Sequence, residues 1–133
     1  MKKKFLALGL MIVLVAVAAV NLYLSSTSEN HQGHLKITLV IDIGSNEKIK
    51  KVEVQNGSTV FDVLNSSASV EYKDYGSLGK LISSIDGNKQ NETYYWTYYV
   101  DGKFAEVASD KYVLTSDSTL LFNYTLNNHL TNV

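Results

Sequence analysis

One stretch of this chain constrains its fold more than any other, namely residues 93–103, Thr-Tyr-Tyr-Trp-Thr-Tyr-Tyr-Val-Asp-Gly-Lys. It places four tyrosines and the only tryptophan in a β-prone run. The run closes on Asp101-Gly102, a dipeptide that favours a type I′ hairpin turn. Soluble domains gather aromatic side chains where these wall a core or form a binding surface. The stretch therefore predicts an aromatic strand in a hairpin.

Period-two alternation gives this strand two faces. The even-numbered residues 94–100 lie on one face and the odd-numbered residues 95–99 on the other. A single sheet layered on one helix buries only one face fully, so the second set should be partly exposed. Two interpretations of the aromatic side chains stay open: packing with cross-strand pairing, or a surface for a ligand or partner.

Residues 1–24 are typical of a signal peptide or an N-terminal membrane anchor. A basic start, residues 2–4, precedes an apolar run at 5–24. Ala16-Val17-Ala18 has the small-x-small form that favours cleavage, whereas a length close to ~20 residues favours retention as a membrane span. In either case the three N-terminal lysines are expected on the cytoplasmic side of the membrane and the rest of the chain outside, secreted or anchored at the cell surface. A polar linker at 25–34 then leaves one domain at 35–127.

The composition of the exported part excludes several classes of function. Nine lysines and thirteen acidic residues follow residue 24, and arginine is absent. A mildly acidic surface without arginine forks is a poor partner for nucleic acid. Cysteine is also absent, which excludes disulfides and thiol chemistry.

Hydrophobic periodicity predicts the other elements. Strands are expected at 34–43, 49–54, 70–72, 81–85, 112–114 and 119–124. Residues 57–64 switch to helical spacing, with Ser58 as the N-cap. One short helix packed on a mixed sheet predicts a small α+β domain of β-grasp-like layout, preceded by the N-terminal signal or anchor helix.

Motifs for chemistry are missing. The sequence has no phosphate-binding loop, no His-Glu-x-x-His and no nucleophile elbow. His31 and His34 lie in the polar linker without a carboxylate partner, so a solvated pair is favoured over a metal site. We therefore expect no enzyme, no metal and no cofactor. Four N-x-S/T sequons would be modified only in a host that glycosylates exported proteins; they begin at Asn56, Asn65, Asn91 and Asn123.

Four blocks occur in a familiar order: GSTVFDVL at 57–64, LISSIDG at 81–87, YWTYYVDG at 95–102, and YVL with LLFNY at 112–114 and 120–124. This pattern resembles the C-terminal β-domain of the transcobalamin and intrinsic factor family. It also resembles the exported prokaryotic domains grouped with them as transcobalamin-like C-terminal domains. The resemblance spans roughly residues 35–125.

The resemblance implies a corrinoid ligand such as cobalamin. In those carriers the β-domain closes over one face of the corrin ring while a helical barrel, which this chain does not match, holds the other. A partner chain supplying the missing half of the cage is therefore implied. Carried over position by position, the ligand contacts fall on Ile82, Ser83, Trp96, Tyr98, Phe104 and Ala105.

The sequence thus predicts an exported, non-enzymatic domain that binds a corrinoid or serves as an accessory module for one at the cell surface. The alternative is a surface module that recognises a protein or polymer and has no small-molecule ligand.

Overall fold

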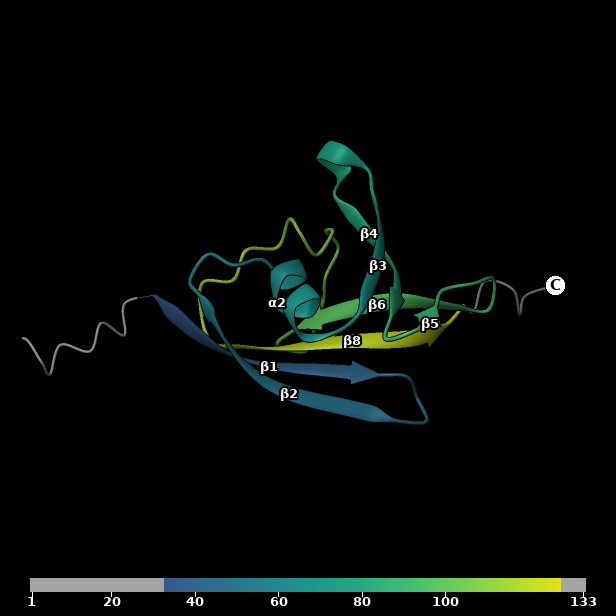
Figure 1. The fold of residues 1–133 in the computed structure, drawn as a ribbon, viewed down its shortest axis with the longest axis horizontal. Coiled ribbons are helices and arrows are strands. Elements are labelled where there is room, and N and C mark those ends of the chain that lie inside the picture. Colours follow the sequence, from purple (N-terminus) through teal and green to yellow (C-terminus); the bar gives the residue numbers. More distant parts are fainter. Residues whose placement is uncertain (1–32, 128–133) are drawn as a thin grey trace, which may run out of the picture. The chain divides into compact units, whose positions relative to one another are not determined.

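The computed structural model describes residues 33–127, which form a mostly β structure (Figure 1). Its elements, in chain order, are β1 (His34–Asp42), β2 (Glu47–Gln55), α2 (Val60–Ser67), β3 (Val70–Asp74), the 3-10 turn η1 (Gly76–Leu78), β4 (Lys80–Ile85), β5 (Asn88–Lys89), β6 (Tyr94–Val100), β7 (Lys103–Phe104) and β8 (Ser118–Leu126). No helix within residues 33–127 is long and apolar enough to cross a membrane. The apolar run at 5–24, expected to be a signal or anchor helix, lies outside the described residues.

The strands form two sheets. The larger has the order β2-β1-β8-β6-β7, in which β1 and β8 are parallel and all other neighbours are antiparallel. The smaller has the order β3-β4-β5 and is antiparallel throughout. The predicted α+β, β-grasp-like class with one mixed sheet is therefore wrong, because within residues 33–127 eight strands in two sheets accompany a single eight-residue α-helix.

A tight turn explains the second sheet. Asp86 has φ +49° and Gly87 has φ +84°, and the turn that they form sends β5 back along β4, with Ser84 opposite Lys89. From the sequence, Asp86-Gly87 was expected only to end the strand at 81–85. This turn closes the β4-β5 hairpin, and a second turn, in which the Tyr75 N–H donates to the Gly79 carbonyl at 2.9 Å, pairs β4 with β3 on its other side.

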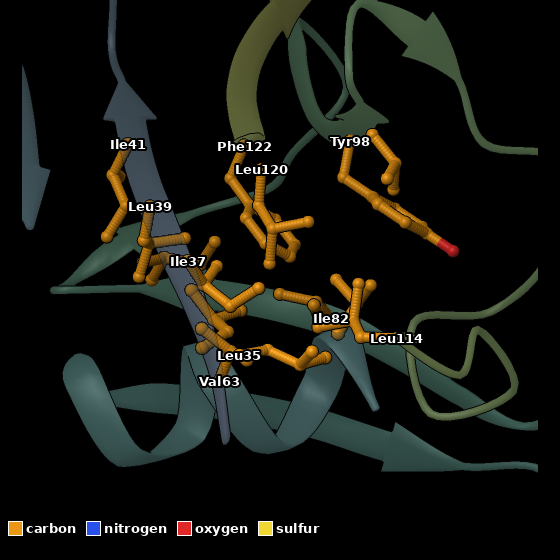
Figure 2. Close-up of a cluster of buried hydrophobic side chains, with 14 residues drawn as sticks. Leu35, Ile37, Leu39, Ile41, Val63, Ile82, Tyr98, Leu114, Leu120 and Phe122 are labelled. Carbon is orange, nitrogen blue, oxygen red and sulfur yellow. The ribbon is translucent and has the colours of Figure 1, made fainter. Parts of the chain in front are cut away.

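The core lies between one face of the larger sheet and α2 (Figure 2). Alternate β1 residues Leu35, Ile37 and Leu39 are buried, as the sequence pattern predicted. They pack with fully buried helix residues such as Val63 and with β8 residues such as Phe122. Transfer of each such side chain from water into the core stabilises the folded state by about 1.5–3 kcal/mol. This burial fixes the position of α2 against the sheet.

The helix begins one residue later than expected. Thr59, not Ser58, is the N-cap, and its hydroxyl accepts from the Asp62 N–H at 3.1 Å. The Asp62 carboxylate accepts from the Thr59 N–H at 2.8 Å, which completes a capping box. The strand expected at 112–114 is reduced to a bridge between Thr59 and Val113.

Two aromatic side chains of the larger sheet hold the smaller one. The Trp96 indole donates to the Asn88 carbonyl at 2.9 Å, and the Tyr124 hydroxyl donates to the Lys89 carbonyl. The two rings lie 4.9 Å apart between centroids. Since both acceptors belong to β5, these contacts fasten the β3-β4-β5 sheet to β6 and β8.

Candidate functional site

A groove of about 540 Å³ lies beside β6. One wall is the hairpin of residues 70–85, here called the arm, which projects from the larger sheet in Figure 1. The other wall is residues 104–109, here called the rim loop. Three of the groove's lining residues, Ile82, Tyr98 and Phe122, belong to the buried cluster of Figure 2. The lining residues are Tyr75, Leu78–Ile82, Tyr95–Tyr98, Phe104–Ser109 and Phe122.

Both walls present apolar side chains to solvent. Leu78 at the arm tip is 79% exposed, and Phe104 in β7 is 56% exposed. Leu81 and Val107 are each about half exposed and line the same groove. Exposed apolar side chains gathered in one concavity are typical of a binding surface rather than of an inert one.

Tyr98 anchors the rim loop from below. Its hydroxyl donates to the Val107 carbonyl at 2.6 Å, and its ring stacks on Phe122 with centroids 5.5 Å apart. Figure 2 shows the ring beside the core, with the hydroxyl directed away from Phe122 and Leu120. Burial, with smaller contributions from nearby Tyr112 and Asp110, raises the pKa of the Tyr98 phenol. The phenol therefore stays protonated and remains a hydrogen-bond donor.

The arm meets the rim loop at Gly79. This residue has φ +98°, and a Cβ there would lie 2.5 Å from the Ala108 Cβ and 2.7 Å from Asp110 Oδ1. The next residue, Lys80, donates its backbone N–H to the same Asp110 oxygen at 2.8 Å. Only glycine allows the arm backbone to come this close to the Ala108 and Asp110 side chains, so residue 79 sets the distance between the arm and the rim loop.

The charges among the lining residues are few. They are carried by Lys80 and Glu106. The Lys80 ammonium lies over two rings, 4.5 Å from the Phe61 centroid and 4.9 Å from the Tyr72 centroid. Cation–π contacts of this kind hold the lysine ammonium over rings that are not part of the groove lining.

Ser109 supplies an unsatisfied polar atom. The residue is 2% exposed, lines the groove, and its hydroxyl has no hydrogen-bond partner within the described part of the chain. Buried hydroxyls are usually paired, since leaving one unpaired costs about 1–3 kcal/mol.

Five of the six residues expected at the ligand site line this groove: Ile82, Trp96, Tyr98, Phe104 and Ala105. Ser83 does not line it, and the Ser83 carbonyl accepts from the Gln90 N–H of the neighbouring chain segment at 2.9 Å. The structure brings the five together from β4, β6 and the rim loop. Their role in binding stays a prediction.

The sequence did not indicate the arm tip or Ser109. Tyr75, Leu78 and Leu81 line the groove alongside residues assigned from the resemblance. A usable signal was present, because Leu78 and Leu81 are apolar residues beside a turn glycine, where solvated polar side chains are usual.

Residues 33–127 contain no group of three or more His, Asp or Glu side chains that could hold a metal ion. His31, part of the predicted solvated pair, lies outside the described residues. The groove's lining offers shape, apolar area and a few hydrogen-bonding groups.

A family model described as "Domain of unknown function (DUF4430)" matches residues 57–126, more than half of the chain. No curated protein matches the sequence. The matched segment contains α2, the arm, β6, the rim loop and β8, and therefore the whole groove.

Solved structures share the fold. A candidate metal binding protein from Ruminococcus gnavus ATCC 29149 has a TM-score of 0.61 and 16% identity, over 70% of this chain and 98% of that one. Haptocorrin in complex with cobinamide (Cbi) has a TM-score of 0.64 and 21% identity, over 73% of this chain and 26% of that one. This chain thus corresponds to about a quarter of haptocorrin. At these identities the similarity establishes the fold.

Proposed function

Because the chain belongs to the DUF4430 family, whose description leaves function open, we propose a function from the groove: a non-enzymatic binding module for a flat, amphipathic ligand of the corrinoid class. The observation that carries the proposal is a groove of about 540 Å³ with apolar walls on a fold shared with haptocorrin, whose structure holds cobinamide. Small-molecule sites in proteins commonly enclose about 300–1,000 Å³.

The lining supports apolar recognition. Phe104, Leu78 and Val107 offer exposed apolar area on opposing walls, and Trp96 is half-buried between them. A broad ring would bury area against these side chains at about 25 cal/mol per Å². Only one face of such a ligand is covered by this domain. We therefore expect weak binding by this chain alone, about micromolar or poorer, and a partner chain covering the other face.

The proposal includes location. Residues 1–24 have the pattern of a signal or anchor, so the domain is placed outside the cytoplasmic membrane, secreted or attached through residues 5–24. Protease added to intact spheroplasts should digest the domain. Full protection would contradict an external location.

The test of the ligand is an absorbance titration of the purified full chain with cobalamin and with cobinamide. Phe104→Ala removes an exposed groove side chain and should weaken binding by about 1–3 kcal/mol. Ile49→Ala is the matched control, because Ile49 is 60% exposed on β2, away from the groove. No binding by folded protein at millimolar concentration would overturn the corrinoid proposal.

A further inference from the structure

The two edges of the larger sheet are built differently. On the β2 edge, Lys48, Lys50 and Lys51 occupy three of four successive positions. Lysines on an edge strand discourage pairing with another chain. On the opposite side, β7 pairs with β6 only at Tyr99 and Val100, so the edge of β6 from residue 94 to 98 lies beyond the hairpin ladder. That stretch contains no charged residue.

Hydrogen bonds at the ends of β6 fix which backbone groups face this edge. The Asp101 N–H donates to the Thr119 carbonyl at 2.9 Å, and the Thr93 carbonyl accepts from Asn127 at 2.6 Å. Odd-numbered residues of the strand therefore bond to β8. Even-numbered residues face outward, as the Tyr98 carbonyl does in accepting from the Ala105 N–H at 3.0 Å.

Trp96 lies in the middle of this edge. The preceding outward residue, Tyr94, is satisfied by Asn91, whose N–H donates to the Tyr94 carbonyl and whose side chain accepts from the Tyr94 N–H, both at 2.8 Å. Within residues 33–127, nothing pairs with the backbone N–H or carbonyl of Trp96, or with the N–H of Tyr98. These three groups have the donor and acceptor order that a neighbouring strand would satisfy.

The groove follows this edge. Its lining includes Tyr95 and Thr97 from one face of β6 and Trp96 and Tyr98 from the other. An occupant that contacts both faces of a strand lies in the plane of the sheet. An extended peptide does so, because its side chains alternate above and below that plane.

We propose that the free edge of β6 accepts an extended, uncharged peptide segment of another protein, which adds as a strand beside Trp96. The segment should be uncharged, because the lining carries one lysine, already placed over two rings, and one glutamate. Strand addition draws affinity from main-chain hydrogen bonds and selectivity from alternate side chains. The inference goes beyond the corrinoid proposal and uses the same groove, so the two occupants exclude each other.

The probe is a panel of fluorescein-labelled heptapeptides with Val, Ile, Thr or Tyr at alternate positions and Ser or Gln between them. Fluorescence anisotropy with the full chain should find binders. In the best binder, N-methylation of residues whose N–H faces β6 should weaken binding by about tenfold or more, whereas N-methylation of their neighbours should not. Amide exchange at Trp96 and Tyr98 should slow when the peptide binds.

Variants of the protein complete the test. Tyr95→Lys places a charge beside the free edge and should weaken peptide binding by about tenfold. Ile49→Lys, on the β2 edge of the same sheet, should leave it unchanged, and thermal melting checks that both variants fold. Uniform sensitivity to N-methylation, absence of any binder at millimolar protein, or self-association without peptide binding would overturn the proposal. Cobinamide absorbance is read separately, so either ligand can fail alone.

Discussion

At the scale of single residues, one hydroxyl holds a wall of the groove. Tyr98 is 9% exposed and belongs to the core, yet its hydroxyl reaches the Val107 carbonyl in the rim loop. Alternation in the sequence predicts that Tyr98 lies on the same face of the strand as Trp96, but it does not indicate how deeply each side chain is buried. Because Tyr98 is buried, it supports the groove from within the core more than it offers a surface that a ligand would cover.

Removing that hydroxyl should loosen the rim loop without a cavity. Tyr98→Phe is expected to lower the free energy of unfolding by about 1–2 kcal/mol, because the Val107 carbonyl loses its donor while the ring stays packed. Urea denaturation measures the change. Tyr99→Phe is the control, since that neighbouring hydroxyl has no partner within residues 33–127; equal losses in both variants would show that the Val107 bond adds nothing.

Gly79 is the second residue on which the groove depends. Gly79→Ala should cost about 2–4 kcal/mol, because its φ is +98° and the new methyl would overlap Ala108 and Asp110. Gly44→Ala shares a positive φ, +82°, but meets open space, so it should cost about 1 kcal/mol. Guanidinium melts of both variants compare them. Similar losses would mean that backbone conformation, and not the contact between arm and rim loop, sets the cost.

At the scale of elements, the turn between β4 and β5 contains a carboxylate whose contacts depend on pH. The Asp86 carboxylate accepts from the Ser69 N–H at 2.9 Å and pairs with the Lys48 ammonium of β2 at 3.2 Å. The Ser69 hydrogen bond is the main cause that lowers the Asp86 pKa from 3.8; partial burial opposes it, and Lys48 adds to it. The carboxylate therefore stabilises the fold above its unfolded pKa.

This contribution should disappear in acid. As the pH falls from 5 to 3 and through the lowered pKa of Asp86, the wild-type Tm should drop more steeply than that of Asp86→Asn. Asparagine keeps the positive φ of the turn at low cost, so the variant should fold normally. Differential scanning calorimetry across this range measures both slopes. Parallel slopes would show that Asp86 has the same pKa folded and unfolded.

The same turn explains how far elements could be predicted. β1, β6 and α2 follow from alternation and helical spacing, because each buries one regular face. β2 follows from alternation as well, although its inward residues are only half-buried. β5 and β7 have two residues each and depend on turns, so no period reveals them. The sheet to which β4 belongs is decided by the Asp86-Gly87 hairpin, and tertiary pairing of that kind is not contained in periodicity.

At the scale of the whole molecule, the candidate site is shared between two sheets. Residues from β4 and β6 were assigned by resemblance and do lie in one groove. The arm tip and Ser109 were not, because their place depends on how the arm packs against the rim loop at Gly79. Sequence reasoning found the strands that contribute to the groove, whereas its depth and its polar groups required the structure.

The coupling of the sheets gives the last prediction. Trp96→Phe with Tyr124→Phe removes both donors to β5 while keeping two rings in place. Each hydrogen bond contributes about 0.5–1.5 kcal/mol to stability. Losing both should therefore lower the free energy of local opening of the β3-β4-β5 sheet by about 1–3 kcal/mol. Hydrogen exchange should then quicken by about tenfold in residues 70–89 and stay unchanged in β1 and β8. Tyr95→Phe, which changes an exposed ring, is the control. Faster exchange throughout the domain would mean that the two sheets unfold as one unit, and the arm would then be a fixed wall of the groove instead of a separately mobile one.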